Sequence, residues 1–203
     1  MKSIDEYLDD AAQSHGHLCA GQVLGVRMAV LGLQLLGLED PRGRDRKRLF
    51  TFVEIDRCAT DAVTVVTGCR LGKRSLKFRD WGKVAATFVD VQTGRAVRVV
   101  ARESSKQLAL SRHPEIAEKN EQQMLAYREM ADSDLFEVQH VRVELGPEEM
   151  PGYRSERVCC EECGEGINFH REVRRHGRIL CRACAGERYY SVVGEQYRHK
   201  DAA

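Results

Sequence analysis

Four cysteines near the end of the sequence constrain the fold of this chain more than any other feature. They form two Cys-x2-Cys pairs, Cys160 with Cys163 and Cys181 with Cys184, and seventeen residues separate the pairs. This spacing is typical of a zinc ribbon, in which four thiolates surround one ion as a tetrahedron. Because four thiolates leave no position open for a substrate, we expect structural zinc. A rubredoxin-like iron site has the same ligand set and stays an alternative.

The segment between the pairs, EGINFHREVRRHGRIL, has a strand-turn-strand pattern with His176 at its tip. Cys159 offers a Cys-x3-Cys alternative to Cys160, but the glycine that follows Cys163 favours Cys160. The chain holds eight cysteines. In a reducing compartment these are expected to be metal ligands or reactive thiols rather than disulfides.

The length of 203 residues suits one ordinary domain with a small second one. We expect an α+β domain over residues 1–150 and the ribbon over 151–203, with Gly and Pro residues marking the linker. The N-terminal stretch is acidic and amphipathic and does not resemble a secretory signal, so a cytoplasmic location is expected. The apolar tract 23–38 is too short to cross a bilayer, and no membrane segment is expected.

Hydrophobic periodicity predicts the elements of the first domain. Helices are expected over residues 3–13, 20–36 and 111–131. The second carries Gly21 and Gly25 on one face, where another backbone could approach closely. The last has Pro114 near its first turn and is polar, which favours a connecting helix at the surface. Strands are expected over residues 49–56, 83–91, 95–101 and 136–145, the middle two as a hairpin.

The stretch HGHLCAG places three good metal ligands just before a long apolar helix. If this stretch is extended, His15, His17 and Cys19 project to the same side. The helix start lowers the pKa of a thiol placed there, so Cys19 is expected to be a metal ligand or a reactive thiolate. On residue statistics alone, ordinary polar histidines and a core cysteine are the simpler interpretation.

A second group of polar residues surrounds a short helix after the strand 49–56. Cys58 lies in the loop that follows this strand, and Cys69 follows the helix directly. Loops at strand ends are where such folds commonly expose working side chains.

Three segments closely resemble the FmdE family, which is named for the E component of formylmethanofuran dehydrogenase. They are HGHLCAGQVLGVRMAVLGLQLLGL, EIDRCATDAVTVVTGCRLGKRSLKFRDWGKVAATF and the ribbon cysteines. The resemblance runs over residues 15–100 and resumes in the ribbon. It implies an α+β domain with an antiparallel sheet and packed helices, which dimerises and carries a polar pocket. The E component is associated with a molybdenum or tungsten enzyme that fixes carbon dioxide onto methanofuran.

Carried over from the family, the residues that line the pocket are His17, Cys19, Cys58, Asp61, Cys69 and Lys73. His17, Cys19 and Cys58, with His15 as a weaker ligand, are expected to hold a second soft divalent metal. Asp61 would orient a histidine or handle a proton, and Lys73 would stabilise an anionic substrate. A metal-free pair of redox thiols, Cys19 with Cys58, is the alternative. Ala20 departs from the family pattern, in which proline is common.

The resemblance implies a metal-binding accessory protein of redox or one-carbon metabolism, with a homodimeric state and a molybdenum, tungsten or other redox enzyme as partner. Whether the chain is itself an enzyme stays open. The alternative is a ribbon-bearing interaction or regulatory protein that binds a ligand without catalysis. Nucleic acid is not an expected partner, because the formal net charge is only +1 and the basic run Arg42–Arg48 is interpreted as a solvated loop.

Overall fold

The computed structural model describes residues 1–193 and divides the chain into two compact units. The first unit is Met1–Leu145 and the second is Gly146–Ala203. The stretch expected as a linker therefore opens the second unit, where it includes the short 3-10 helix η2 (Pro147–Glu149). The two units are described separately below.

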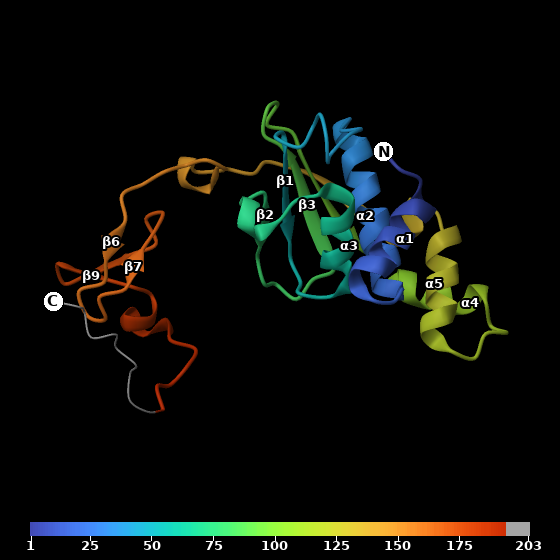
Figure 1. The fold of residues 1–203 in the computed structure, drawn as a ribbon. Coiled ribbons are helices and arrows are strands. Elements are labelled where there is room, and N and C mark those ends of the chain that lie inside the picture. The colour runs from blue at the N-terminus through green and yellow to red at the C-terminus, as the bar shows by residue number, and fades with distance from the viewer. Residues whose placement is uncertain (194–203) are drawn as a thin grey trace. The chain divides into compact units, whose positions relative to one another are not determined.

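The first unit is built on a five-stranded sheet with the strand order β2-β1-β3-β4-β5 (Figure 1). Only the edge pair of β1 and β2 is parallel, and the other three pairs are antiparallel. The hairpin expected from the sequence is confirmed as β3 and β4. The strands are β1 (Leu49–Val53), β2 (Leu76–Phe78), β3 (Ala85–Asp90), β4 (Ala96–Ala101) and β5 (Phe136–Val141).

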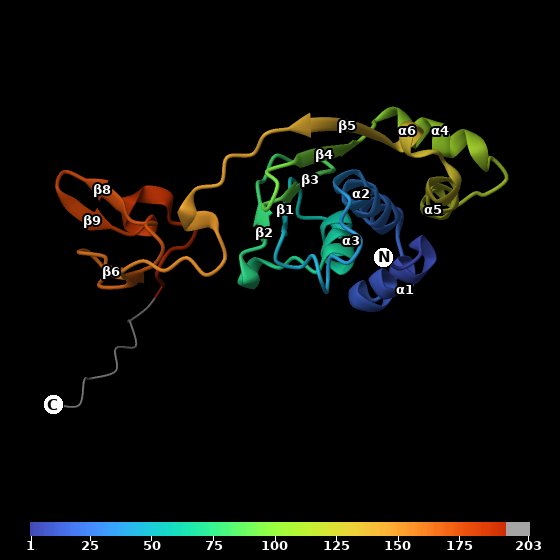
Figure 2. The ribbon, with the colours of Figure 1, turned by 90° about the horizontal axis from the view of Figure 1, so that it is seen from above.

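Three helices cover one face of this sheet, and a second group of helices lies beyond them at one end of the unit (Figure 2). The first group is α1 (Ile4–His15), α2 (Ala20–Leu36) and α3 (Cys58–Thr67). The second group is α4 (Ser104–Arg112), α5 (Lys119–Glu129) and α6 (Asp132–Leu135). This mixture of helices and a mainly antiparallel sheet is the α+β arrangement expected.

Helix α2 lies at the centre of the core, buried around most of its circumference. Its glycines explain how this is possible. A side chain at Gly25 would lie 2.8 Å from the Cα atom of Ala59 on α3, and one at Gly32 would overlap the ring of Phe88 on β3. The close approach inferred from glycines four residues apart is therefore confirmed at Gly25. Within residues 1–193, neither α2 nor any other helix is both long and apolar enough to cross a membrane.

The single helix expected over residues 111–131 is wrong, because the segment forms two helices. Helix α4 ends at Arg112, and His113 adopts a non-helical backbone with φ −127° and ψ 60°. The physical reason is Pro114, whose ring disfavours helical geometry in the residue before it. Helix α5 then begins afresh, with the Glu118 side chain accepting hydrogen bonds from the first backbone N–H groups.

Helix α5 is also not a connecting helix to the ribbon. The guanidinium group of Arg27, which is buried on α2, donates to the carbonyl oxygens of Tyr127 at 2.7 Å and Met130 at 2.6 Å. The same group pairs with Asp132 at 2.6 Å. These contacts hold the end of α5 against α2, and α6 and β5 follow before the second unit begins.

The second unit contains two small hairpins and a helical turn. Its elements are β6 (Val158–Cys159), β7 (Gly166–Ile167), β8 (Val173–Arg175), β9 (Arg178–Leu180) and η3 (Ala183–Glu187). His176 and Gly177 turn β8 into β9 with φ values of 51° and 78°, which is the backbone of a tight hairpin turn. The expected strand-turn-strand pattern is confirmed.

Candidate functional site

The four ribbon cysteines are assembled for a metal ion. Their sulfur atoms all lie within 4.8 Å of one another, and the Sγ atoms of Cys163 and Cys181 are 3.9 Å apart. A tetrahedral zinc ion with Zn–S bonds of about 2.3 Å requires sulfurs roughly 3.8 Å apart, so the donor set fits zinc. Cys160 is the buried member of this set, whereas Cys159 is exposed and outside it.

Backbone donors prepare these sulfurs to be thiolates. The Cys181 N–H donates to the Sγ of Cys160 at 3.2 Å, and the Cys184 N–H donates to the Sγ of Cys181 at 3.4 Å. Backbone donors from Cys163 and Cys181 lower the pKa of Cys160 to about 6. Burial and then the neighbouring sulfurs raise the pKa of Cys184 to about 12. One anion is therefore favoured without a cation, and four become favourable only around a metal ion.

A second thiol cluster forms in the first unit, where α2 and α3 begin side by side. Cys19 is the N-cap residue of α2, and Cys58 is the first residue of α3. A side chain at Gly21 would lie 3.5 Å from the Cβ atom of Cys58 and 3.8 Å from the Sγ atom of Cys19. The two thiols also hydrogen bond to each other. The structure thus brings together the two cysteines that the resemblance assigned to one pocket.

The two histidines of HGHLCAG lie beside this thiol pair. His15 ends α1, and its ring centroid lies 5.0 Å from that of His17. The Nδ1 atom of His15 is 3.0 Å from a carboxylate oxygen of Asp61 on α3. The histidine that Asp61 orients is therefore His15, whereas His17 is exposed in the loop.

The histidines and thiols of the first unit do not close around one point. Over residues 1–193, the ribbon cysteines form the single group of three or more ligand atoms within 4.8 Å of one another. Cys58 is also not prepared as a nucleophile. Burial, and then the hydrogen bond with Cys19, raise the pKa of Cys58 above its ordinary value.

Cys69 and Lys73 lie away from this cluster, contrary to the carry-over from the family. Cys69 follows the far end of the ten-residue helix α3, about 15 Å from its start. Its sulfur is buried, accepts from the Thr51 hydroxyl at 3.4 Å and donates to the Leu49 carbonyl at 3.6 Å. Burial raises the pKa of Cys69, which makes it a core thiol. Lys73 lies on η1 (Leu71–Lys73) and borders a different cavity.

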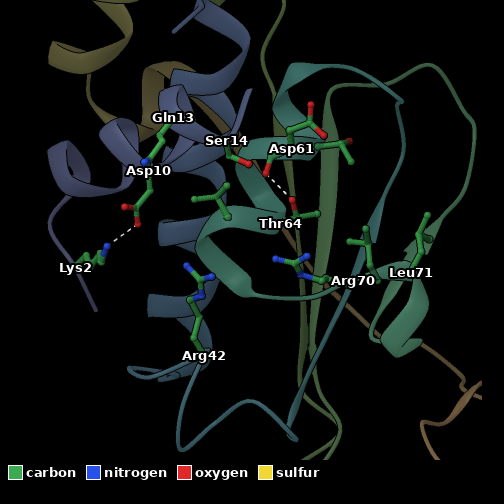
Figure 3. A pocket seen from close by; sticks show the side chains of 12 residues that line it. Lys2, Asp10, Gln13, Ser14, Arg42, Asp61, Thr64, Arg70 and Leu71 are labelled. Carbon is green, nitrogen blue, oxygen red and sulfur yellow. Dashed lines mark hydrogen bonds and ion pairs between the residues drawn. The ribbon is translucent and has the colours of Figure 1, made fainter. Parts of the chain in front are cut away.

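A larger pocket along α3 was not anticipated from the sequence. It has a volume of about 730 Å³, and Asp61 is the one expected site residue among its lining. Figure 3 shows Arg42 and Arg70 pointing into the space beside α3, below Asp61 and Thr64. The available signals were the basic run that contains Arg42 and the spacing of Thr60 and Thr64 on one helix face.

Comparisons with known proteins agree with a mixed α/β domain joined to a four-cysteine zinc finger. The model of the family described as "FmdE, Molybdenum formylmethanofuran dehydrogenase operon" matches residues 14–137. The model of the prokaryotic dksA/traR C4-type zinc finger matches residues 151–190. The chain therefore belongs to the FmdE family and carries a C-terminal C4 zinc finger.

Two similar proteins extend this assignment. A protein of Archaeoglobus fulgidus described as a probable S-adenosyl-L-methionine-binding protein is 35% identical over 202 residues. The match covers 91% of this chain but 53% of that protein, so the chain spans about half the length of this relative. The crystal structure of an FmdE-like protein of tungsten formylmethanofuran dehydrogenase, from Syntrophus aciditrophicus, has a TM-score of 0.64 at 24% identity. The match covers 94% of this chain and 96% of that one, and it supports the fold.

Proposed function

We propose that this chain is a metal-binding accessory protein of redox or one-carbon metabolism. In this proposal the C-terminal finger holds structural zinc, and the thiol cluster of the first unit holds a second, soft divalent ion. The observation that carries the proposal is the convergence of Cys19 and Cys58 from the starts of two helices, beside the imidazoles of His15 and His17. Thiolate and imidazole are the ligands that zinc and similar soft ions prefer.

The geometry supports an open site rather than a closed one. Two thiols already lie together, and the exposed His17 is free to turn toward them as a third ligand. Three protein ligands leave one coordination position for a small molecule or for transfer to another protein. A metal bound there would supply a Lewis acid beside the Asp61–His15 pair. Asp61 would hold the His15 ring in place and raise its basicity.

Homodimerisation and a molybdenum, tungsten or other redox enzyme as partner are further parts of this proposal. They are supported by the family's description as belonging to the formylmethanofuran dehydrogenase operon. We place the protein in the cytoplasm, where the free thiols of the cluster stay reduced. Light scattering at micromolar concentration tests the dimer, and a mass near that of one 23.0 kDa chain would contradict it.

The central test is a cobalt titration of the full chain loaded with zinc in the finger. Cobalt bound to thiolates has intense absorption bands, which report sulfur ligands directly. We expect one further equivalent of cobalt to bind with such bands, and the Cys19→Ser/Cys58→Ser double variant to lose them. The matched control is Cys69→Ser, which removes a buried thiol outside the cluster and should keep the bands. If the wild type shows no further thiolate band, the chain is better described as a ribbon-bearing interaction or regulatory protein.

A second candidate function is the binding of S-adenosyl-L-methionine, which is favoured by the description of the Archaeoglobus relative. The pocket along α3 offers carboxylates for the sulfonium cation, from Asp10 and Asp61, and guanidinium groups for the carboxylate, from Arg42 and Arg70. Calorimetry with S-adenosyl-L-methionine should then give saturable binding that Asp61→Asn weakens. Absence of binding to the wild type would remove this candidate and leave the metal proposal untouched.

A further inference from the structure

Four positively charged side chains surround one cavity at the end of α3. The cavity has a volume of about 320 Å³ and is lined by Arg42, Arg46, Gly68, Arg70 and Lys73. No acidic side chain belongs to this lining. The cations come from two segments, the basic run Arg42–Arg48 and the turn after α3. We call these four side chains the basic cluster.

The basic cluster is not neutralised within the part of the chain that the structure describes. Its neighbours in the same loop are paired: Arg44 lies 3.1 Å from Glu39, and Arg48 lies 2.7 Å from Asp90. Across residues 1–193, the ion pairs formed by arginine and lysine include none from the basic cluster. The same basic run therefore separates into paired cations and unpaired ones, and two of the unpaired cations line the cavity.

The loop that carries Arg42 and Arg46 is fixed by a buried carboxylate. Asp45 is 2% exposed and accepts hydrogen bonds from the backbone N–H groups of Glu39 and Asp40, both at 3.1 Å. It also pairs with Arg48 at 3.0 Å. This segment is therefore ordered rather than a simple solvated loop, and the interpretation of the basic run from sequence needs correction.

The end of α3 explains only part of this arrangement. Helix α3 ends at Gly68, and the Cγ atom of Arg42 lies 3.1 Å from the position that a side chain at Gly68 would take. The free carbonyl groups of a helix end carry a partial charge of about −0.5. Four full positive charges exceed this several-fold, while the whole chain has a formal charge of only +1. A local excess of this size is favourable when an anion occupies the cavity.

We propose that the basic cluster binds the diphosphate group of a small-molecule ligand. Guanidinium groups bind phosphate oxygens through paired hydrogen bonds, and a lysine adds a point charge. The adjoining pocket along α3 shares Arg42 and Arg70 with this cavity, and it has room for the organic part of the ligand. Figure 3 shows these two guanidinium groups on the same side of α3 as Thr64 and Leu71.

This site differs from a nucleic-acid interface in its shape. A duplex or single strand is bound by cations spread along a surface or groove, whereas these four converge on one cavity. The site also does not depend on the metal proposed at Cys19 and Cys58. Serine variants of those cysteines should leave anion binding unchanged, so the two proposals fail separately.

Calorimetric titration of the full chain with inorganic pyrophosphate and with ADP tests the proposal. We expect saturable binding with one equivalent per chain, and at least tenfold weaker binding in the Arg42→Gln/Arg70→Gln variant. The matched control is Lys47→Gln/Lys119→Gln, which removes the same charge from exposed residues outside the cavity. Circular dichroism of all variants establishes that they fold alike.

Three outcomes would overturn the proposal. The first is no binding of either probe to the wild type at 50 mM salt. The second is an equal loss of affinity in the control variant, which would indicate an unspecific effect of net charge. The third is binding of a single-stranded oligonucleotide without binding of pyrophosphate or ADP, which would indicate a nucleic-acid surface.

Discussion

The two cysteine groups of this chain offer the same ligand chemistry at different stages of assembly. In the finger, four sulfurs lie within 4.8 Å of one another and are ready for an ion. In the first unit, Cys19 and Cys58 hydrogen bond to each other, while His15 is held by Asp61 and His17 stays in solvent. The finger is thus a closed site, and the thiol cluster is an open one that needs a rearrangement to bind metal.

The difference follows from where the ligands come from. Each finger pair comes from one tight turn, and backbone N–H groups of the same turns solvate the sulfurs. The cluster ligands come from the ends of three helices, so their distances depend on how α1, α2 and α3 pack. The finger also has a core of only a few side chains, whereas the first unit has a large core of its own. Metal is therefore expected to be essential for the fold of one unit only.

The largest effect is expected from removing a finger ligand. Cys163→Ser should release the zinc and unfold residues 153–193, since structural zinc contributes about 10–16 kcal/mol in comparable peptides. Limited proteolysis with mass spectrometry should show cleavage confined to the second unit. Cys159→Ser is the matched control, because this exposed cysteine lies beside the ligands but outside the set. Unchanged metal content and protease resistance in Cys163→Ser would contradict the zinc assignment.

A moderate effect is expected from separating the two helices that carry the cluster. Gly25→Ala places a methyl group 2.8 Å from both the Cα atom of Ala59 and the side chain of Ala62. Overpacking of this kind costs about 1–3 kcal/mol. Thermal unfolding should therefore shift for the first unit, with zinc in the finger retained. Gly72→Ala is the control, because nothing lies within 4 Å of its added methyl group. Equal stability of the two variants would show that the α2–α3 contact is not tight.

The smallest effect concerns Ala20, the position where the family commonly has proline. The Ala20 N–H donates to the side-chain oxygen of Asn120 at 3.2 Å, a bond that proline cannot make. Asn120→Ala should cost about 1 kcal/mol. Ala20→Pro should cost less in the Asn120→Ala background than in the wild type, because the bond is then already lost. Urea unfolding of the four proteins forms a double-mutant cycle, and strict additivity would argue against this bond.

The sequence was most informative where structure is local. The finger ligands, the turn at His176 and the β3–β4 hairpin all depend on residues close together in the chain, and all are confirmed. Helix α2 was also predictable, because its apolar residues and its terminal Gly37 are local signals.

Contacts between distant segments could not be predicted in the same way. Pro114 suits a first helical turn as well as a helix end, and the packing of α5 against Arg27 decides between them. Cys69 shares a short segment with Cys58, but the length of α3 separates the two. The order in the basic run depends on the burial of Asp45, which becomes visible only when Arg48 meets Asp90.

The most direct test of the comparison is the metal content of the full chain by native mass spectrometry, after loading with zinc and brief exposure to a weak chelator. The account predicts two ions per wild-type chain before the chelator and one after it. It also predicts that Cys19→Ser/Cys58→Ser starts with one ion and keeps it, whereas Cys163→Ser starts with one ion and loses it. A wild type that holds a single ion throughout, with the Cys19→Ser/Cys58→Ser chain indistinguishable from it, would contradict the claim that the first unit contains an open metal site.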